Sequence, residues 1–186
     1  MYLATLFIPM LFVLAYMLKN APDLLERRMR MREHESEQKQ LIKISYIIFM
    51  LTFLLPGFDV RYGWSQMPAF VAIAANLIVL LGYGIFYIVV RENQYASRVI
   101  EVDTAQQVIS SGPYAVVRHP MYAGLLLLYI FSPIALGSYW AVIPVICMVP
   151  IMVGRIINEE KVLTRDLKGY SEYLQKVRYR LIPGIW

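Results

Sequence analysis

The chain has little charge and very few residues of the kinds that bind metals or form cross-links. Of its 186 residues only 17% are charged, whereas 59% are hydrophobic, and the mean hydropathy is +0.52. Soluble globular domains carry about 25% charged residues. The composition therefore excludes a disordered chain, a collagen-like chain and an ordinary water-soluble enzyme. The basic pI of 9.3 does not indicate a nucleic-acid partner, because Lys and Arg on a membrane protein first report its orientation.

Cysteine and histidine are nearly absent. Cys147 is the single cysteine, and His34 and His119 are the two histidines. One cysteine builds no disulfide framework, and within its apolar run we expect Cys147 to be a small buried hydrophobe. No HExxH or CxxC spacing is present, so we expect no metal site built by the protein.

Long uncharged runs are abundant and predict an all-α polytopic membrane protein with about five transmembrane helices. A run of about 20 apolar residues crosses the ~30 Å hydrocarbon core. The uncharged stretch 121–154 is too long for one span and is interrupted by Pro133, Gly137 and Ser138, which predicts a helical hairpin formed by the last two spans. One tilted span with a re-entrant segment is the alternative. The expected spans are 1–18, 44–58, 67–90, 120–136 and 139–158.

The basic residues gather in three segments that these spans separate. Segments 19–43 and 91–120 and the tail from Arg155 hold all of the Lys and Arg except Arg61. Five spans place the three segments on one side of the membrane. The positive-inside rule makes that side cytosolic, with the N-terminus outside and the C-terminus inside. Segment 23–43 interleaves its basic residues with glutamates, which fits either a solvated, salt-bridged surface helix or a lipid-headgroup site.

Two polar motifs flank the predicted hairpin. The first contains a turn at 111–114 and then Arg118-His119-Pro120, where Pro120 suits the first turn of a helix. It fits either an anion site at a helix N-terminus or an interfacial arginine within an aromatic belt.

The second motif ends the last span. Arg155 and Glu159 are four residues apart and share a helix face. Carboxylates at membrane depth usually face a polar cavity or a partner, although both glutamates are simply hydrated if the helix has left the bilayer. The antiparallel hairpin would bring Pro120 close to Glu159. It thereby predicts a pocket of cations and anions at the membrane surface.

The ordered motifs 111–114, 118–124 and Glu159-Glu160 resemble the isoprenylcysteine carboxyl methyltransferase family and the related phospholipid N-methyltransferases. The similarity extends over about residues 70–186. Members are integral membrane enzymes that use S-adenosylmethionine without a Rossmann domain. The resemblance implies one integral membrane domain, 1–186, in which 1–66 form accessory spans and 67–186 a catalytic core with a cytosolic cofactor pocket.

The resemblance also implies roles for individual residues. Gly82 and Gly84 match a Gly-x-Gly element of the phospholipid enzymes, although small residues in a membrane helix commonly serve close packing. The implied catalytic residues are Arg155, Glu159 and His119. The implied cofactor-binding residues are Tyr114, Arg118, His119, Pro120, Tyr122, Glu160, Gly82 and Gly84.

The expected partners are membrane lipids and a lipid-like or prenylated small molecule that accepts the methyl group. The prenylated cysteine carboxylate is the first choice, with a phospholipid amine or a hydrophobic thiol as alternatives. A carboxylate is already ionised at pH 7 and Arg155 would position it. An amine or thiol would benefit from a general base, for which His119 or Glu159 is the candidate.

A second resemblance keeps another activity open. The ending 169–183 is similar to the C-terminus of membrane sterol reductases, which bind NADPH. Those enzymes typically have an Asn where Met121 stands and lack the proline of Pro120. These differences favour a methyltransferase. An NADPH-dependent reductase of a sterol or lipid, or a non-enzymatic membrane protein, are the alternatives.

Overall fold

A computed structural model describes residues 1–29, 36–97, 102, 103 and 105–186. The described residues form seven α helices and one 3-10 turn, and no strand occurs among them. The elements are α1 (Tyr2–Asn20), α2 (Pro22–Met29), α3 (Ser36–Tyr62), α4 (Ala69–Glu92), η1 (Gly112–Ala115), α5 (Pro120–Ala135), α6 (Val142–Asp166) and α7 (Tyr170–Lys176).

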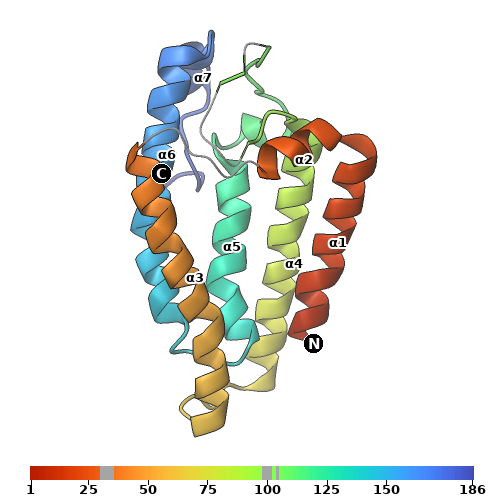
Figure 1. Ribbon diagram of the computed structural model, residues 1–186, viewed down its shortest axis with the longest axis vertical. Helices are drawn as coiled ribbons and strands as arrows, with labels where there is room; N and C mark the ends of the chain where they lie inside the picture. The colour runs from red at the N-terminus through yellow and green to blue at the C-terminus, as the bar shows by residue number, and fades with distance from the viewer. Residues whose placement is uncertain (30–35, 98–101, 104) are drawn as a thin grey trace.

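Five apolar helices make up the bundle, which confirms the predicted all-α polytopic membrane fold. Four of them, in α1, α3, α4 and α6, are long and apolar enough to cross a bilayer, whereas α5 has only 16 residues. A helix of that length spans about 24 Å, less than the ~30 Å of hydrocarbon. It contacts α3, α4 and α6, so protein rather than lipid surrounds much of its backbone (Figure 1).

The expected limits of two spans differ from those of the helices. The span expected at 44–58 belongs to α3, which extends from Ser36 to Tyr62. The last span, expected at 139–158, begins three residues later, at Val142, and continues to Asp166. Charged residues end a hydrophobic run but not a helix, because backbone hydrogen bonds continue through them.

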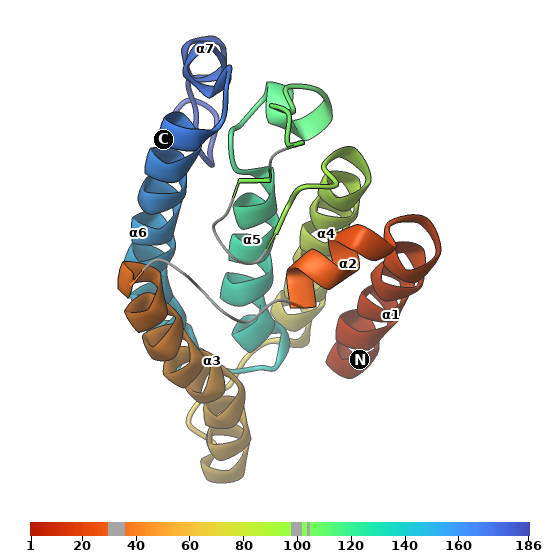
Figure 2. The same cartoon turned by 45° about the horizontal axis from the view of Figure 1, so that its top comes forward.

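The helices alternate in direction, so the connections gather at two ends of the bundle (Figures 1 and 2). One end holds α2, η1 and α7 and is called here the basic end. The opposite end holds the α3–α4 connection and the turn between α5 and α6, and is called the turn end. The described parts of the three basic segments all lie at the basic end, as the span count requires.

Close backbone contact joins α4 to α5, the most extensive helix pair. A Cβ atom at Gly82 would stand 2.9 Å from the carbonyl oxygen of Gly124, and one at Gly124 would stand 3.0 Å from the carbonyl oxygen of Gly82. Real Cβ atoms essentially never come within 3.0 Å of another atom, so the first contact excludes a side chain and the second is very tight. Membrane helices use such small residues because lipid provides no hydrophobic force to press helices together. The packing interpretation of Gly82 is therefore the one that its surroundings support.

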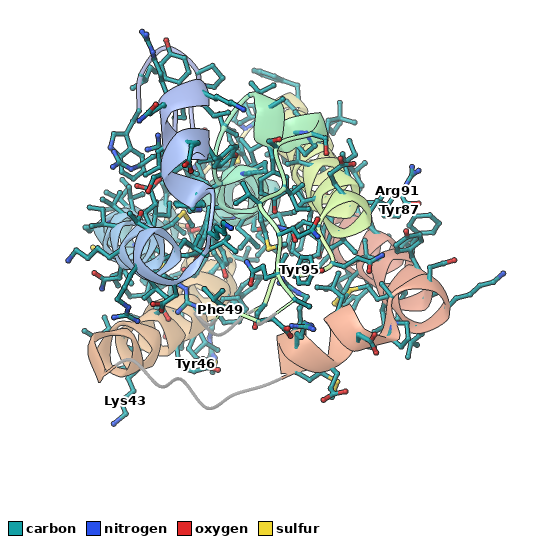
Figure 3. All side chains as sticks on the ribbon, turned by 90° about the horizontal axis from the view of Figure 1, so that it is seen from above. Lys43, Tyr46, Phe49, Tyr87, Arg91 and Tyr95 are labelled. Carbon is teal, nitrogen blue, oxygen red and sulfur yellow. The ribbon has the colours of Figure 1, made fainter. Side chains whose placement is uncertain are left out.

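Aromatic residues join α1 to the other side of α4. Tyr87 packs against Phe12 and Tyr16 with ring centroids 5.2 Å apart in both pairs. Arg91 lies over the Tyr87 ring at 5.8 Å, and both residues lie on the side of α4 turned toward α1 (Figure 3).

Much of the outer surface is apolar, as expected for helices in lipid. Large hydrophobic residues such as Phe70 and Leu77 of α4 are exposed. Cys147 is also exposed, on α6, so the expectation that it is buried was wrong. Apolar sequence predicts burial in a soluble domain, but on a membrane helix the lipid-facing side is equally apolar.

Candidate functional site

The segment that precedes α5 is held by the C-terminal segment. The backbone N–H of Arg118 donates to the carbonyl of Tyr179, and that of His119 donates to the carbonyl of Arg180, both at 2.9 Å. The Arg118 guanidinium donates to the carbonyls of Val177 and Arg178 at 2.9 and 3.1 Å. Residues about 60 positions apart are thereby fixed against each other where α5 begins.

A buried carboxylate lies at the centre of this contact. Glu160 accepts a hydrogen bond from Arg118 Nε on Oε1 at 2.7 Å and from Arg180 Nε on Oε2 at 2.8 Å. His119 Nε2 lies 3.3 Å from the same Oε1. The side chains of Arg118, His119 and Glu160 are only 7%, 4% and 10% exposed. Burying a carboxylate is costly unless it is paired and hydrogen-bonded, and here both oxygens are engaged.

A second chain of hydrogen bonds lies beside the first. Arg155 Nε donates to the Tyr122 hydroxyl at 3.0 Å, and that hydroxyl donates to Glu159 Oε2 at 2.8 Å. Glu159 Oε1 is 3.9 Å from His119 Nδ1. The antiparallel hairpin therefore brings the start of α5 against the end of α6. Arg155, Glu159 and Tyr122 lie together at the basic end of the bundle.

Buried tyrosine hydroxyls complete the polar surroundings. Asn93 Nδ2 donates to the Tyr114 hydroxyl at 2.9 Å, and the Tyr173 hydroxyl donates to the backbone carbonyl of Tyr114 at 2.8 Å. Burial raises the pKa of Tyr114 above its usual range and that of Tyr173 to about 12. Both hydroxyls are therefore neutral at pH 7 and act as hydrogen-bond groups rather than as bases.

These groups border a cavity of about 490 Å³, within the usual range for small-molecule sites. Its wall has a polar part at the basic end, formed by charged, amide and hydroxyl side chains. An apolar part extends between α3, α5 and α6. The polar part includes Arg28, Asn93, Gln106, Gln107, Tyr114, Arg118, His119, Tyr122, Arg155 and Glu159, and the apolar part includes Tyr46, Phe49, Leu125, Tyr129, Met148, Ile151 and Met152.

Six of the ten residues expected in the site line this cavity, among them all three expected catalytic residues. They are Tyr114, Arg118, His119, Tyr122, Arg155 and Glu159. Glu160 lies behind them, bound to Arg118 and His119, and Pro120 is buried as the first residue of α5. Gly82 faces α5, and a Cβ at Gly84 would meet nothing within 4 Å. Neither glycine of the Gly-x-Gly element therefore lines the cavity.

Several wall residues come from parts of the chain to which the motifs did not point. Arg28 belongs to α2, and Tyr46 and Phe49 belong to α3. In Figure 3 Phe49 lies on the side of α3 turned toward the bundle, whereas Lys43 points away from it. Phe49 also meets Tyr129 of α5 edge-on, with ring centroids 6.3 Å apart. The alternation of polar and apolar residues within 23–49 is the sequence signal that could have indicated these wall positions. This alternation is too irregular to predict them.

Comparison with protein families decides the class of the chain. The family described as phospholipid methyltransferase matches residues 70–169, which contain η1, α5, α6 and all of α4 except its first residue. The chain belongs to this family. It is accordingly a membrane methyltransferase, and the reductase reading of the ending 169–183 is not supported. No curated protein matches the chain.

The family match covers only part of the structure. It begins at residue 70, so α1, α2 and α3 lie outside it. Arg28, Tyr46 and Phe49 nevertheless line the cavity. The matched region supplies most of the charged residues of the site, the C-terminal segment adds Arg180, and the N-terminal segment supplies part of the wall.

Proposed function

We propose that the protein transfers a methyl group from S-adenosylmethionine to a lipid-like acceptor within the cavity at the basic end. The observation that carries this proposal is one continuous cavity with a charged part and an apolar part. The charged part suits a polar cofactor that enters from water. The apolar part, between helices that carry exposed hydrophobic residues, suits the chain of a lipid.

The residues present fit the cofactor's chemistry. S-adenosylmethionine carries an adenine ring, a ribose diol and an amino-acid group with both an ammonium and a carboxylate. Glu159 can accept hydrogen bonds from the diol or the ammonium, and an arginine of the wall can donate to the carboxylate. The amides of Gln106 and Gln107 and the rings of Tyr114 and Tyr170 also line the cavity and suit the adenine.

The protein's task in such a reaction is mainly alignment. When bound, the cofactor would supply an electrophilic methyl group on a sulfonium, which the acceptor would take up in line with the breaking carbon–sulfur bond, with S-adenosylhomocysteine as the leaving group. Correct placement of the two reactants supplies a large part of the rate gain in such displacements. Tyr122 holds Glu159 and Arg155 in one hydrogen-bonded chain. Glu160 fixes Arg118 and His119 from behind and is in this proposal a positioning residue.

For the acceptor, the carboxylate of an isoprenylcysteine is the first choice. Arg155 would bind that carboxylate, which needs no general base because it is ionised at pH 7. A phospholipid amine is the second candidate, favoured by the description of the matched family. With an amine, His119 or Glu159 would remove the proton.

The proposed placement in the membrane follows from charge. The basic end would face the cytosol, with the N-terminus outside and residues 67–186 as the catalytic core. A polar cofactor made in the cytosol would then reach the cavity directly.

Binding and turnover in detergent test the proposal. Isothermal titration of the purified full chain with S-adenosylhomocysteine should give saturable binding, and titration with NADPH should give none. Labelled methyl groups should then appear on farnesylcysteine or on phosphatidylethanolamine, which decides between the two acceptors. Binding of NADPH without S-adenosylhomocysteine, or of neither, would contradict the proposed cofactor.

A further inference from the structure

The short helix α2 lies across the basic end of the bundle (Figure 2). Its Leu24 is 1% exposed and packs with Met17 of α1 and Val90 of α4. Two further contacts tie it to the segment that follows α4. Arg27 Nη1 is 2.7 Å from Asp103 Oδ2, and Arg28 Nη1 donates to the Ala96 carbonyl at 3.0 Å.

Of these two neighbouring arginines, only Arg28 lines the cavity. Its guanidinium lies 5.0 Å from the ring centroid of Phe86, and its Nη1 is 3.1 Å from the sulfur of Met121. Met121 lies between His119 and Tyr122 in the first turn of α5. Arg28 is therefore held beside the proposed reaction site by contacts with α4, α5 and the segment after α4. Such fixed placement lowers the entropy cost of binding a ligand.

The charges of the cavity wall are unequal. Within the described part of the chain, the wall contains three arginines, Arg28, Arg118 and Arg155, and one glutamate, Glu159. Glu160 neutralises Arg118 from behind. Among the described residues of the wall, positively charged side chains thus outnumber negatively charged ones, and this composition suits an anion. Arginine suits phosphate and carboxylate because its planar fork matches the geometry of their oxygens.

We propose that Arg28 is an oxyanion-binding residue of the cavity, supplied by the N-terminal segment that the family match does not include. The bound group is a phosphate or a carboxylate. It belongs either to the headgroup of the lipid acceptor or to the amino-acid part of the cofactor. The assignment of these two sources rests on the proposed function, whereas the oxyanion site itself does not.

Dodecyl phosphate is a suitable first probe, because its anionic head and apolar tail match the two parts of the cavity wall. Its affinity for the full chain in a neutral detergent would be compared with that of dodecanol. We expect the phosphate to bind more tightly, and Arg28→Met to lower its affinity at least tenfold while leaving dodecanol unchanged. Arg28→Lys should recover part of that loss, since it keeps the charge but lacks the planar fork.

Arg27→Met is the matched control. It removes the neighbouring arginine and its pair with Asp103, yet takes no charge from the cavity wall. If loosening of α2 explained the loss, Arg27→Met would show it as well. The proposal is overturned if Arg28→Met binds dodecyl phosphate like the wild type, if Arg27→Met loses as much, or if the wild type prefers dodecanol.

Two nucleosides then separate the sources of the oxyanion. S-adenosylhomocysteine carries the amino-acid carboxylate, whereas methylthioadenosine lacks it. If Arg28→Met weakens only the first, the oxyanion belongs to the cofactor. If neither changes and the KM for the lipid acceptor rises, it belongs to the headgroup. Absence of nucleoside binding by the wild type would contradict the proposed function, while the dodecyl phosphate result would still decide the role of Arg28.

Discussion

Among the residues that the structure describes, each end of the bundle buries one carboxylate, and the two are held in different ways. At the turn end, Asp59 is 1% exposed and accepts hydrogen bonds from the Ser65 backbone N–H at 2.6 Å, from the Ser65 hydroxyl at 2.7 Å and from the Ser138 hydroxyl. At the basic end, Glu160 accepts from two guanidinium groups. Neutral donors surround the first carboxylate, and cations surround the second.

The surroundings explain this difference. Asp59 fastens α3 to the turn between α5 and α6, where Ser138 is fully buried and its hydroxyl also accepts from the Ala141 N–H at 3.1 Å. The described cavity wall does not reach this end. Glu160 instead stands directly behind cavity residues. A buried carboxylate thus joins helix and turn at one end, and at the other it orients side chains that line the cavity.

The largest effect is expected for Glu160→Gln. The amide cannot neutralise Arg118 and Arg180, and disrupting a buried charge pair costs about 3 kcal/mol or more. The free energy of unfolding, measured by detergent-denaturant titration, should fall by about that amount, and affinity for S-adenosylhomocysteine should fall with it. Glu159→Gln is the matched control, since Glu159 lines the cavity. Glu159→Gln should lower the affinity for S-adenosylhomocysteine while leaving the free energy of unfolding nearly unchanged. If Glu159→Gln instead lowered stability and Glu160→Gln lowered only affinity, Glu159 would be the positioning residue and Glu160 the binding residue.

Asp59→Asn should lower stability by about 2 kcal/mol, because an amide nitrogen would face hydroxyl donors that are buried. Binding of S-adenosylhomocysteine, measured below the unfolding temperature, should stay at the wild-type value. A large loss of affinity in a folded variant would show that the two ends are coupled and would remove the distinction between them.

The helix contact between the two ends can be tested with a pair of glycines. Gly82→Ala should destabilise the protein by about 2 kcal/mol, since the new methyl group would overpack against the backbone of α5. Gly84→Ala meets open space and should keep the wild-type thermal midpoint or raise it. Loss of S-adenosylhomocysteine binding in Gly84→Ala would instead support a cofactor role for the Gly-x-Gly element.

The smallest effect is expected for Tyr122→Phe. Removal of the hydroxyl breaks the chain from Arg155 to Glu159, and one such hydrogen bond contributes about 1 kcal/mol. Methyl transfer should therefore fall several-fold, with the thermal midpoint within a few degrees of the wild type. Unchanged kcat and KM would show that Glu159 and Arg155 hold their positions without Tyr122.

Much of the fold could be predicted because span length and charge placement are properties of the chain alone. Uncharged runs revealed the helices, and Pro133, Gly137 and Ser138 revealed the hairpin. The hairpin in turn predicted that Arg155 and Glu159 would meet the segment that opens α5. The limits of α3 and α6 were missed because a helix continues past its apolar part.

Orientation about the helix axis could not be predicted. Glu159 and Glu160 are neighbours that project about 100° apart on α6, so a small rotation decides which one lines the cavity. The motif treated them as a pair. Cys147 was assigned to the wrong side of the same helix for a related reason, since both the inner and the outer faces of a membrane helix are apolar.

The sequence by itself determined that this chain is a helical membrane protein and placed nearly all of its basic residues at one end, because hydrophobic length and charge act locally along the chain. The tertiary structure decided which of those charges meet. Arg28 contacts Met121, 93 residues away, and Glu160 binds Arg118 and Arg180. These contacts depend on how α2, α5, α6 and the C-terminal segment pack together. The spacing of residues along the sequence does not determine that packing.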